Sequence, residues 1–255
     1  METIKIEHHG PLSQITLNRP EVRNAFNDTL VVELAKAFAD VPDTTRVIVL
    51  AGEGPVFSAG ADLGWMKASA AYTTEQNQAE ALEMAKMFAT LKNCNRVLIA
   101  RVHGAVMGGG IGLVSCCDMV VAAQETRFAF SEVKLGLVPA VISPFVIAKI
   151  GVPNARRYFL SGEFFNAQKA QEMGLINKVV DAENLDSAIE HLVQTIAANG
   201  PEALKACKAL INHVESEQSM ETLAYCAQMI AERRASEEGQ EGLSAFLEKR
   251  KPTWI

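Results

Sequence analysis

Short apolar runs alternate with helix-like segments through the first part of the chain. Two segments, 27–41 and 74–93, carry apolar residues at the spacing of an amphipathic helix. Apolar runs with the length of buried strands flank them, at residues 14–17, 46–52, 96–104 and 118–123. Strands that alternate with helices predict an α/β fold in which the connections cross over the sheet.

The pattern changes after Gly200. From Pro201 onward only helical patterns remain, at residues 201–216, 219–236 and 241–251. Proline suits the first turn of a helix, because the amide hydrogen that it lacks would have no partner there. We therefore expect an α/β core over residues 1–200 and a helical region over residues 201–255.

Three consecutive glycines, residues 108–110, follow the predicted strand at 96–104. A strand, a glycine turn and a helix start leave free backbone N–H groups that can bind an anion. The dinucleotide pattern G-x-G-x-x-G and the phosphate-loop ending G-K-[ST] are both absent from this turn. Two interpretations remain: either the glycines only permit close helix packing, with Gly112 as a tight contact, or their N–H groups stabilise an oxyanion.

A second glycine-rich turn favours the oxyanion interpretation. Residues 52–64 also follow a predicted strand, and Asp62 is typical of a helix start, where a carboxylate caps free N–H groups. Two turns that each offer one N–H group can converge on one carbonyl oxygen. That arrangement is an oxyanion hole.

Composition excludes several other classes. The 255-residue chain carries a formal net charge of −6, which argues against a general nucleic-acid binder. Its five cysteines lack framework spacing and its start lacks an apolar leader, so we expect a reduced, cytoplasmic protein. The longest uncharged apolar stretch, 104–117, is too short and too rich in glycine to span a membrane. The five histidines show no metal-ligand spacing, so we expect no metal site.

Five motifs in one order carry a family resemblance. They are LNRPEVRNAFN, FSAGADL, VHGAVMGGGIGLVSCCDMVVAA, FAFSEVKLGLVPA and ARRYFLSGEFFNAQKAQEMGLINKVV. Together they resemble the enoyl-CoA hydratase/isomerase (crotonase) superfamily, from about residue 15 to residue 180. The resemblance implies a crotonase (ClpP-like) α/β spiral of β-β-α units with two roughly perpendicular sheets. It also implies C-terminal helices that assemble a homotrimer or a hexamer.

The chemistry that the resemblance implies is acyl-CoA chemistry. The N–H groups of Ala61 and Gly109 would polarise the thioester carbonyl, and Glu132 would be the acid-base residue. No cofactor is expected, because coenzyme A is part of the substrate. Further residues are implied for binding of the CoA part or the substrate: Arg23, Ala59, Asp62, Leu63 and Lys67.

One position departs from the two-carboxylate hydratases of this family. They carry a second Glu two places after the glycine triplet, where this chain has Gly112. A single Glu also occurs among Δ3,Δ2-enoyl-CoA isomerases. The stretches AGADLGWM and SEVKLGLVPAVISPFV resemble the 3-methylglutaconyl-CoA and isohexenylglutaconyl-CoA hydratases more closely. In the second stretch, Ser143 and Pro144 predict a helix start with Ser143 as N-cap and Pro144 at the first helical position.

The sequence therefore predicts a lyase that hydrates an α,β-unsaturated acyl-CoA, with a branched glutaconyl-CoA as one candidate substrate. An isomerase that moves a double bond in the same substrate class is the first alternative. A non-catalytic assembly or RNA-associated subunit is the second. We expect His103 and the adjacent Cys116 and Cys117 to be structural, and Trp65 and Met66 to form pocket wall or core.

Overall fold

The computed structural model describes residues 1–216 and 219–255 of the chain. Its main element is a six-stranded sheet in which β1 and β2 pair antiparallel and the other neighbours pair parallel. The order along the sheet is β1 (Ile4–His9), β2 (Leu12–Leu17), β3 (Val47–Gly52), β4 (Val97–Val102), β6 (Met119–Ala123) and β9 (Lys178–Val180). The predicted strands are confirmed as β2, β3, β4 and β6, and the α/β class is confirmed with them.

A second sheet contains three short strands. They are β5 (Ala105–Met107), β7 (Arg127–Ala129) and β8 (Phe165–Asn166). Two consecutive stretches of the chain each give one strand to the main sheet, one to the second sheet and then a helical segment: β4, β5 and α4 (Gly109–Cys116), followed by β6, β7 and η2 (Glu132–Leu135). Because β5 and β7 pair parallel, successive units stack in the same direction. This is the spiral of β-β-α units that the motifs imply.

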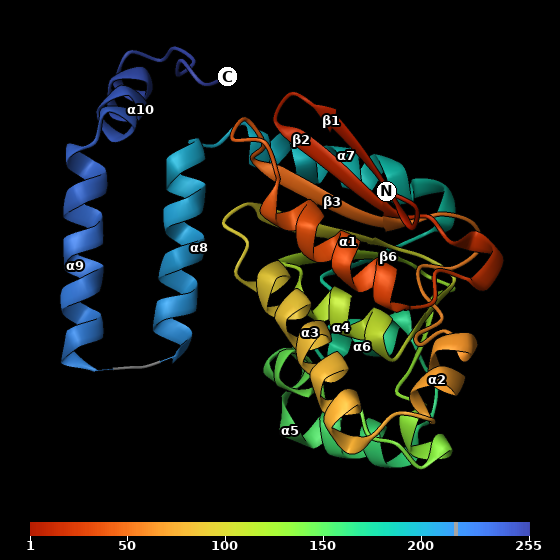
Figure 1. Ribbon diagram of the computed structural model, residues 1–255. Coiled ribbons are helices and arrows are strands. Elements are labelled where there is room, and N and C mark those ends of the chain that lie inside the picture. Colours follow the sequence, from red (N-terminus) through yellow and green to blue (C-terminus); the bar gives the residue numbers. More distant parts are fainter. Residues whose placement is uncertain (217–218) are drawn as a thin grey trace.

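Helices cover both faces of the main sheet (Figure 1). One layer contains α1 (Asp28–Ala39), α3 (Thr74–Lys92), α4, α5 (Ser143–Ser161) and α6 (Ala167–Glu172), and α7 (Leu185–Ala197) covers the other face. Successive residues of β3 alternate between the two cores: Ile48 and Leu50 face the first layer, and Val47 and Val49 pack with α7. The strands are continuous apolar runs because both of their faces are buried.

Four short helical segments complete the part of the chain before Pro201. They are η1 (Pro20–Val22), α2 (Leu63–Ser69), η2 (Glu132–Leu135) and η3 (Ala182–Asn184). Asp62 is the N-cap of α2, where its carboxylate accepts from the N–H groups of Gly64 and Trp65. The expectation that Asp62 starts a helix is therefore confirmed.

The start of α5 corrects the sequence interpretation by one residue. Ile142 is the N-cap, and Ser143 and Pro144 occupy the first two helical positions. The Ser143 hydroxyl donates to the carbonyl of Ala140 at 2.8 Å, so it serves the preceding turn rather than capping the helix. The helix is kinked at Gly151, whose φ is +71°.

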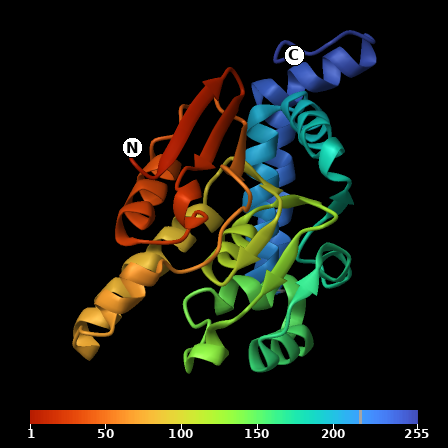
Figure 2. The ribbon, with the colours of Figure 1, turned by 90° about the vertical axis from the view of Figure 1, so that its right-hand side faces the viewer.

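Three C-terminal helices stand beside the core (Figures 1 and 2). They are α8 (Pro201–Ser216), α9 (Met220–Ala235) and α10 (Glu237–Leu247). Lys208 ties α8 to the core, because its ammonium group donates to Asp118 at 2.7 Å and to the Arg96 carbonyl at 2.9 Å. None of the helices in the described residues is both long enough and apolar enough to cross a bilayer.

The last predicted helix is displaced. It was expected over residues 241–251, whereas α10 starts at Glu237 and ends at Leu247. Lys249 adopts a left-handed conformation with φ of +57°, and the N–H of Arg250 returns to the carbonyl of Ala245. A left-handed residue of this kind is a common way to end a helix, and it leaves Lys249–Lys251 outside the helix.

Gly112 is a tight contact between α4 and its neighbours, as expected. A Cβ at this position would lie 2.4 Å from Ile142 Cγ2 and 2.8 Å from Phe88 Cε1. Both neighbours are buried core side chains, so neither can move away without disturbing the packing around it. A side chain at residue 112 is therefore excluded by packing alone.

We predict that Gly112→Ala lowers the free energy of unfolding by about 1–3 kcal/mol, because the added methyl group overpacks the core. Ile142→Ala in the same chain removes the nearest clashing atom, so the double variant should lose less than the two single variants together. Chemical denaturation of the four proteins measures this coupling. Strictly additive losses would contradict the proposed contact.

Candidate active site

Backbone hydrogen bonds join the two glycine turns side by side. The N–H of Ser58 donates to the carbonyl of Ala105 at 3.2 Å, and the N–H of Met107 donates to the carbonyl of Ser58 at 2.9 Å. These bonds form a parallel bridge between Ser58 and Val106, so the segment after β3 runs next to β5. The turn after β3 and the turn after β5 consequently end next to each other.

Ala61 presents a free N–H group where the first turn ends. Phe26 bonds the residues on both sides of it: its N–H donates to the carbonyl of Gly60 at 2.7 Å, and its carbonyl accepts from Asp62 at 2.9 Å. Successive residues of an extended segment direct their backbone groups to opposite sides, so the N–H of Ala61 points away from Phe26. It has no hydrogen-bond partner within the described residues.

Gly109 presents the second free N–H group. It is the first residue of α4, so no carbonyl of the helix can accept from it, and no other described residue does so. The preceding Gly108 is fixed in place, because its N–H donates to the carbonyl of Ala129 in the neighbouring strand β7 at 3.2 Å. The positive end of the α4 dipole adds to the attraction that this N–H exerts on an anion.

Glu132 lies close to the second turn because β5 and β7 are parallel neighbours that end at the same edge. The carboxylate oxygen Oε1 is 2.9 Å from where a Cβ of Gly108 would lie, and the φ of Gly108 is +45°. Glycine is therefore required at 108 both for its backbone conformation and for the approach of Glu132.

The second carboxylate oxygen of Glu132, Oε2, is buried and has no hydrogen-bond partner within the described residues. Burial raises the pKa of Glu132 above its ordinary value of 4.5, although a hydrogen bond to its own backbone N–H opposes this effect. A carboxyl group in such surroundings holds a proton more readily than one in water, which is typical of residues that transfer protons.

Glu132 and the residues of both turns line one cavity of about 490 Å³. Ala59, Ala61, Leu63 and Gly109 belong to its wall, as the sequence analysis expected. The remainder of the wall is mostly apolar. Trp65 and Met66 belong to it, as expected from the sequence, and so does Gly108 of the glycine triplet. The other residues, which no sequence motif marks as wall residues, are Phe26, Gly60, Ala81, Met84, Met107, Ser131, Leu135, Leu137, Val138, Pro139, Ala140, Val141 and Ile142. Apolar walls with a few converging polar groups are characteristic of small-molecule sites.

Three of the expected binding residues lie outside this wall. Arg23 and Lys67 are exposed, and neither lines the cavity. The carboxylate of Asp62 caps α2 and also forms an ion pair with Arg19, in which Nη2 of Arg19 lies 2.9 Å from Oδ2 of Asp62. These contacts lower the pKa of Asp62 against the opposing effect of burial, so Asp62 orders the turn that carries Ala61.

Among the described residues, Glu132 is the sole acidic one that lines the cavity. Ile142 and Phe88 occupy the space that a second carboxylate at residue 112 would need. The packing of the core around residue 112 therefore leaves no room for the second carboxylate of the two-carboxylate hydratases.

The residues expected to be structural have structural surroundings. His103 contacts the carbonyl of Gly54 at 2.8 Å through Nε2 and Arg101 through Nδ1. Cys116 and Cys117 are buried free thiols, and burial raises the pKa of Cys116 to about 12. Within residues 1–216 and 219–255, no group of three or more histidine, cysteine, aspartate or glutamate side chains is arranged to hold a metal ion.

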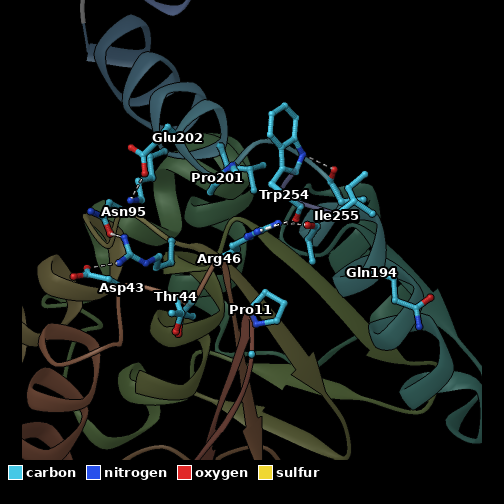
Figure 3. Close-up of a pocket in the computed structure, with 17 residues that line it drawn as sticks. Pro11, Asp43, Thr44, Arg46, Asn95, Gln194, Pro201, Glu202, Trp254 and Ile255 are labelled. Atoms are coloured by element: carbon cyan, nitrogen blue, oxygen red, sulfur yellow. Dashed lines mark hydrogen bonds and ion pairs between the residues drawn. The ribbon is translucent and has the colours of Figure 1, made fainter. Parts of the chain in front are cut away.

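A larger cavity, of about 710 Å³, lies at the other end of the sheet beside α7 and the C-terminal residues (Figure 3). Its central cation, Arg46, donates to the carbonyls of Ala197 and Trp254, and the indole of Trp254 donates to Ala198. These donors hold the C-terminal residues against the core. The cavity lined by Glu132 is therefore the better candidate for chemistry.

Comparison with known proteins assigns the family. A family model described as enoyl-CoA hydratase/isomerase matches residues 7–255. The chain belongs to this family. The match extends beyond the five motifs, because it also includes the three C-terminal helices.

Relatives of this family match nearly the whole chain. The 2,3-dehydroadipyl-CoA hydratase of Escherichia coli strain K12 is 36% identical, over 93% of this chain and 92% of that protein. The crystal structure of an enoyl-CoA hydratase from Shewanella pealeana is 38% identical with a TM-score of 0.94, covering 99% of this chain and 96% of that one. Pseudomonas aeruginosa AtuE is 35% identical with a TM-score of 0.96, covering 99% of both chains. The crotonase fold predicted from the motifs is thus confirmed.

We predict that Glu132→Gln raises the melting temperature more at neutral pH than near pH 4. Because the pKa of Glu132 is raised by folding, the wild-type protein loses stability as the pH rises from the ordinary pKa through the raised one. The neutral amide lacks this loss. Melting curves of both proteins over this pH range measure the loss, and a stability difference that does not change with pH would contradict the raised pKa of Glu132.

Proposed function

We propose that the protein is an enoyl-CoA hydratase, which adds water across the double bond of an α,β-unsaturated acyl-CoA. The observation that carries this proposal is one mostly apolar cavity lined by Ala61 and Gly109, whose backbone N–H groups have no partner within the described residues, and by Glu132, whose carboxyl group has one buried oxygen. The names of the relatives described above support the same reaction class.

In the proposed reaction, the N–H groups of Ala61 and Gly109 donate to the thioester oxygen. Glu132, as a carboxylate, takes a proton from water while the water oxygen bonds to the β-carbon. The electron pair of the double bond moves to the thioester oxygen, which becomes an enolate held by the two N–H groups. Glu132 then returns a proton to the α-carbon. Each backbone donor contributes about 3 kcal/mol at the transition state in sites of this type.

One carboxyl group can perform both proton transfers because it accepts a proton in the first and donates it in the second. The raised pKa of Glu132 favours the first transfer, since its conjugate base binds a proton more tightly than an exposed carboxylate does. No cofactor is required in this scheme, because coenzyme A enters as part of the substrate.

Isomerisation is the alternative that the single carboxyl group favours. The same Glu132 would take a proton from one carbon of a 3-enoyl-CoA and return it to another, with the same enolate held by the same N–H groups. The two reactions differ in mass and in their use of water. Hydration adds water, whereas isomerisation leaves the mass unchanged.

The narrower substrate prediction, a branched glutaconyl-CoA, remains to be tested. Its free carboxylate would need a cation or polar donors, and no Lys, Arg or His of residues 1–216 and 219–255 lines the cavity. A panel of crotonyl-CoA, medium-chain enoyl-CoAs and 3-methylglutaconyl-CoA distinguishes the candidates. Binding of the whole panel without turnover would instead favour a non-catalytic subunit.

Two exposed basic side chains, Arg23 and Lys67, are our candidates for binding the phosphate groups of coenzyme A. Arg23 precedes the Phe26 segment, and its backbone carbonyl accepts from the N–H of Ala59 at 2.9 Å. Lys67 lies on α2, which is joined to Ala61 by its N-cap Asp62. We also propose a cytoplasmic location, which the five free cysteines support.

We predict that Glu132→Gln lowers turnover by about a hundredfold to ten-thousandfold, because general acid-base catalysis is lost. Glu125→Gln, at an exposed position, is the matched control and should keep wild-type turnover. The assay runs in water enriched in heavy oxygen, and mass spectrometry of the product reads the label. If the wild-type protein is active but its product contains no solvent oxygen, the result contradicts hydration and favours isomerisation.

The C-terminal region, residues 201–255, is our candidate for the oligomerisation region. Its helices expose large apolar side chains: Ile211, Met220, Leu223, Ile230, Leu243, Phe246 and Leu247. Apolar side chains that gather on one part of a surface mark protein contacts.

We predict a homotrimer or a hexamer, in which a second copy covers these side chains. Light scattering at micromolar concentration measures the mass. Phe246→Glu, at a side chain that is 80% exposed, should shift the mass towards the monomer without unfolding the core. A wild-type protein that is monomeric at this concentration would contradict the assembly.

A further inference from the structure

Helix α2 carries part of the cavity wall but has little packing of its own. It spans Leu63–Ser69, none of its residues is buried, and Leu63 is 83% exposed. A seven-residue helix without a buried face has little stability in isolation, so its position depends on its contacts with neighbouring elements. The contact at its start is the ion pair between Asp62 and Arg19.

The contact at its first turn is a hydrogen bond from Trp65 to α3. The indole Nε1 of Trp65 donates to Oε1 of Glu80 at 2.5 Å. The Trp65 ring packs against the main core and lines the cavity, with Ala81 and Met84 of α3 in the same wall. Glu80 is half-buried and does not line the cavity itself, so it acts on the cavity only through Trp65.

We propose that Glu80 is a positioning residue that fixes Trp65 as the specificity-determining wall of the acyl cavity. This inference rests on the proposed enoyl-CoA hydratase function. The indole is the largest side chain in the wall, and the hydrogen bond prevents it from rotating out of the cavity. The substrate class that this arrangement selects is the short enoyl-CoA, because a longer acyl chain needs the space that the ring occupies.

The hydrogen bond is well suited to this role because it is charge-assisted and partly shielded from water. A carboxylate acceptor gives a stronger bond than a neutral one, and it restricts the indole to one orientation. A glutamine at residue 80 retains an acceptor oxygen, whereas an alanine removes it. This pair of substitutions separates the hydrogen bond from the other consequences of changing the residue.

The test compares kcat and KM for crotonyl-CoA and decenoyl-CoA in the wild-type protein, Glu80→Ala, Glu80→Gln and Trp65→Phe. Glu80→Ala should raise the preference for decenoyl-CoA by about fivefold to tenfold, mainly through a lower KM for the longer chain. Trp65→Phe should act similarly, because the ring loses its donor and part of its size. Glu80→Gln should restore most of the wild-type preference.

Glu83→Gln is the matched control, since Glu83 lies on the same helix with its side chain 65% exposed and paired with Lys86. It should leave the preference unchanged. The double variant Glu80→Ala with Trp65→Phe should shift the preference no further than Trp65→Phe alone, because the phenylalanine has already lost the bond that Glu80 accepts. A purely structural role would lower stability or kcat for both substrates alike, and that result would overturn the proposal.

A spectroscopic measurement tests the inference independently of turnover. The chain has two tryptophans, so Trp254→Phe leaves Trp65 as the only indole. In this background, Glu80→Ala should shift the Trp65 emission to longer wavelength and tighten binding of saturated decanoyl-CoA relative to butyryl-CoA. If the wild-type protein hydrates no enoyl-CoA but these shifts occur, the proposed function fails and the positioning role stands. Turnover with an unchanged chain-length preference and unchanged emission would overturn the positioning role alone.

Discussion

The site depends on the backbone hydrogen bonds that hold the two glycine turns, after β3 and after β5, side by side. Ser58 bonds Ala105 and Met107, and Phe26 bonds Gly60 and Asp62. The bonds to Phe26 occupy the carbonyl of Gly60 and the N–H of Asp62, so the N–H of Ala61 is directed to the other side and has no partner within the described residues. Because both free N–H groups belong to the backbone of paired segments, their separation is fixed before any ligand arrives, as electrostatic preorganisation requires.

The position of Glu132 follows from the same pairing. The parallel strands β5 and β7 end at one edge, and Gly108 is bonded across this edge to Ala129. The carboxyl group that comes after β7 therefore approaches the glycine turn that comes after β5. Gly112, on the next turn of α4, packs against Ile142 and Phe88 instead of offering a second carboxylate. The same helix thus positions one donor and excludes a second acid.

Much of this arrangement can be predicted from the sequence because its elements have local patterns. The strands of the main sheet are buried on both faces and appear as apolar runs, and Asp62 marks a helix start. The glycine turns and Glu132 are recognisable from short motifs. The role of each glycine is less predictable: the Cβ that would meet the carboxylate belongs to Gly108, whereas at Gly109 it would meet the ring of Phe26.

Other features have no local pattern. The strands β5, β7 and β8 have two or three residues each, too few to show an alternation, and the bridge at Ser58 is isolated. The start of α5 was misplaced by one residue because the Ser143 hydroxyl bonds the preceding turn, a choice that depends on the path of the chain before it. The bond between Trp65 and Glu80 joins two helices at positions fifteen residues apart, and no short motif signals it.

The most direct test of the account is the infrared stretching frequency of the thioester carbonyl in a bound, saturated acyl-CoA whose carbonyl carbon is isotopically labelled. Two donors that polarise this carbonyl should lower its frequency relative to the free compound. Gly109→Ala keeps the N–H group and should keep most of the shift, whereas Gly109→Pro removes the N–H at a helix position that tolerates proline and should lose a large part of it. A bound carbonyl that absorbs at its solution frequency in the wild-type protein would contradict the oxyanion hole.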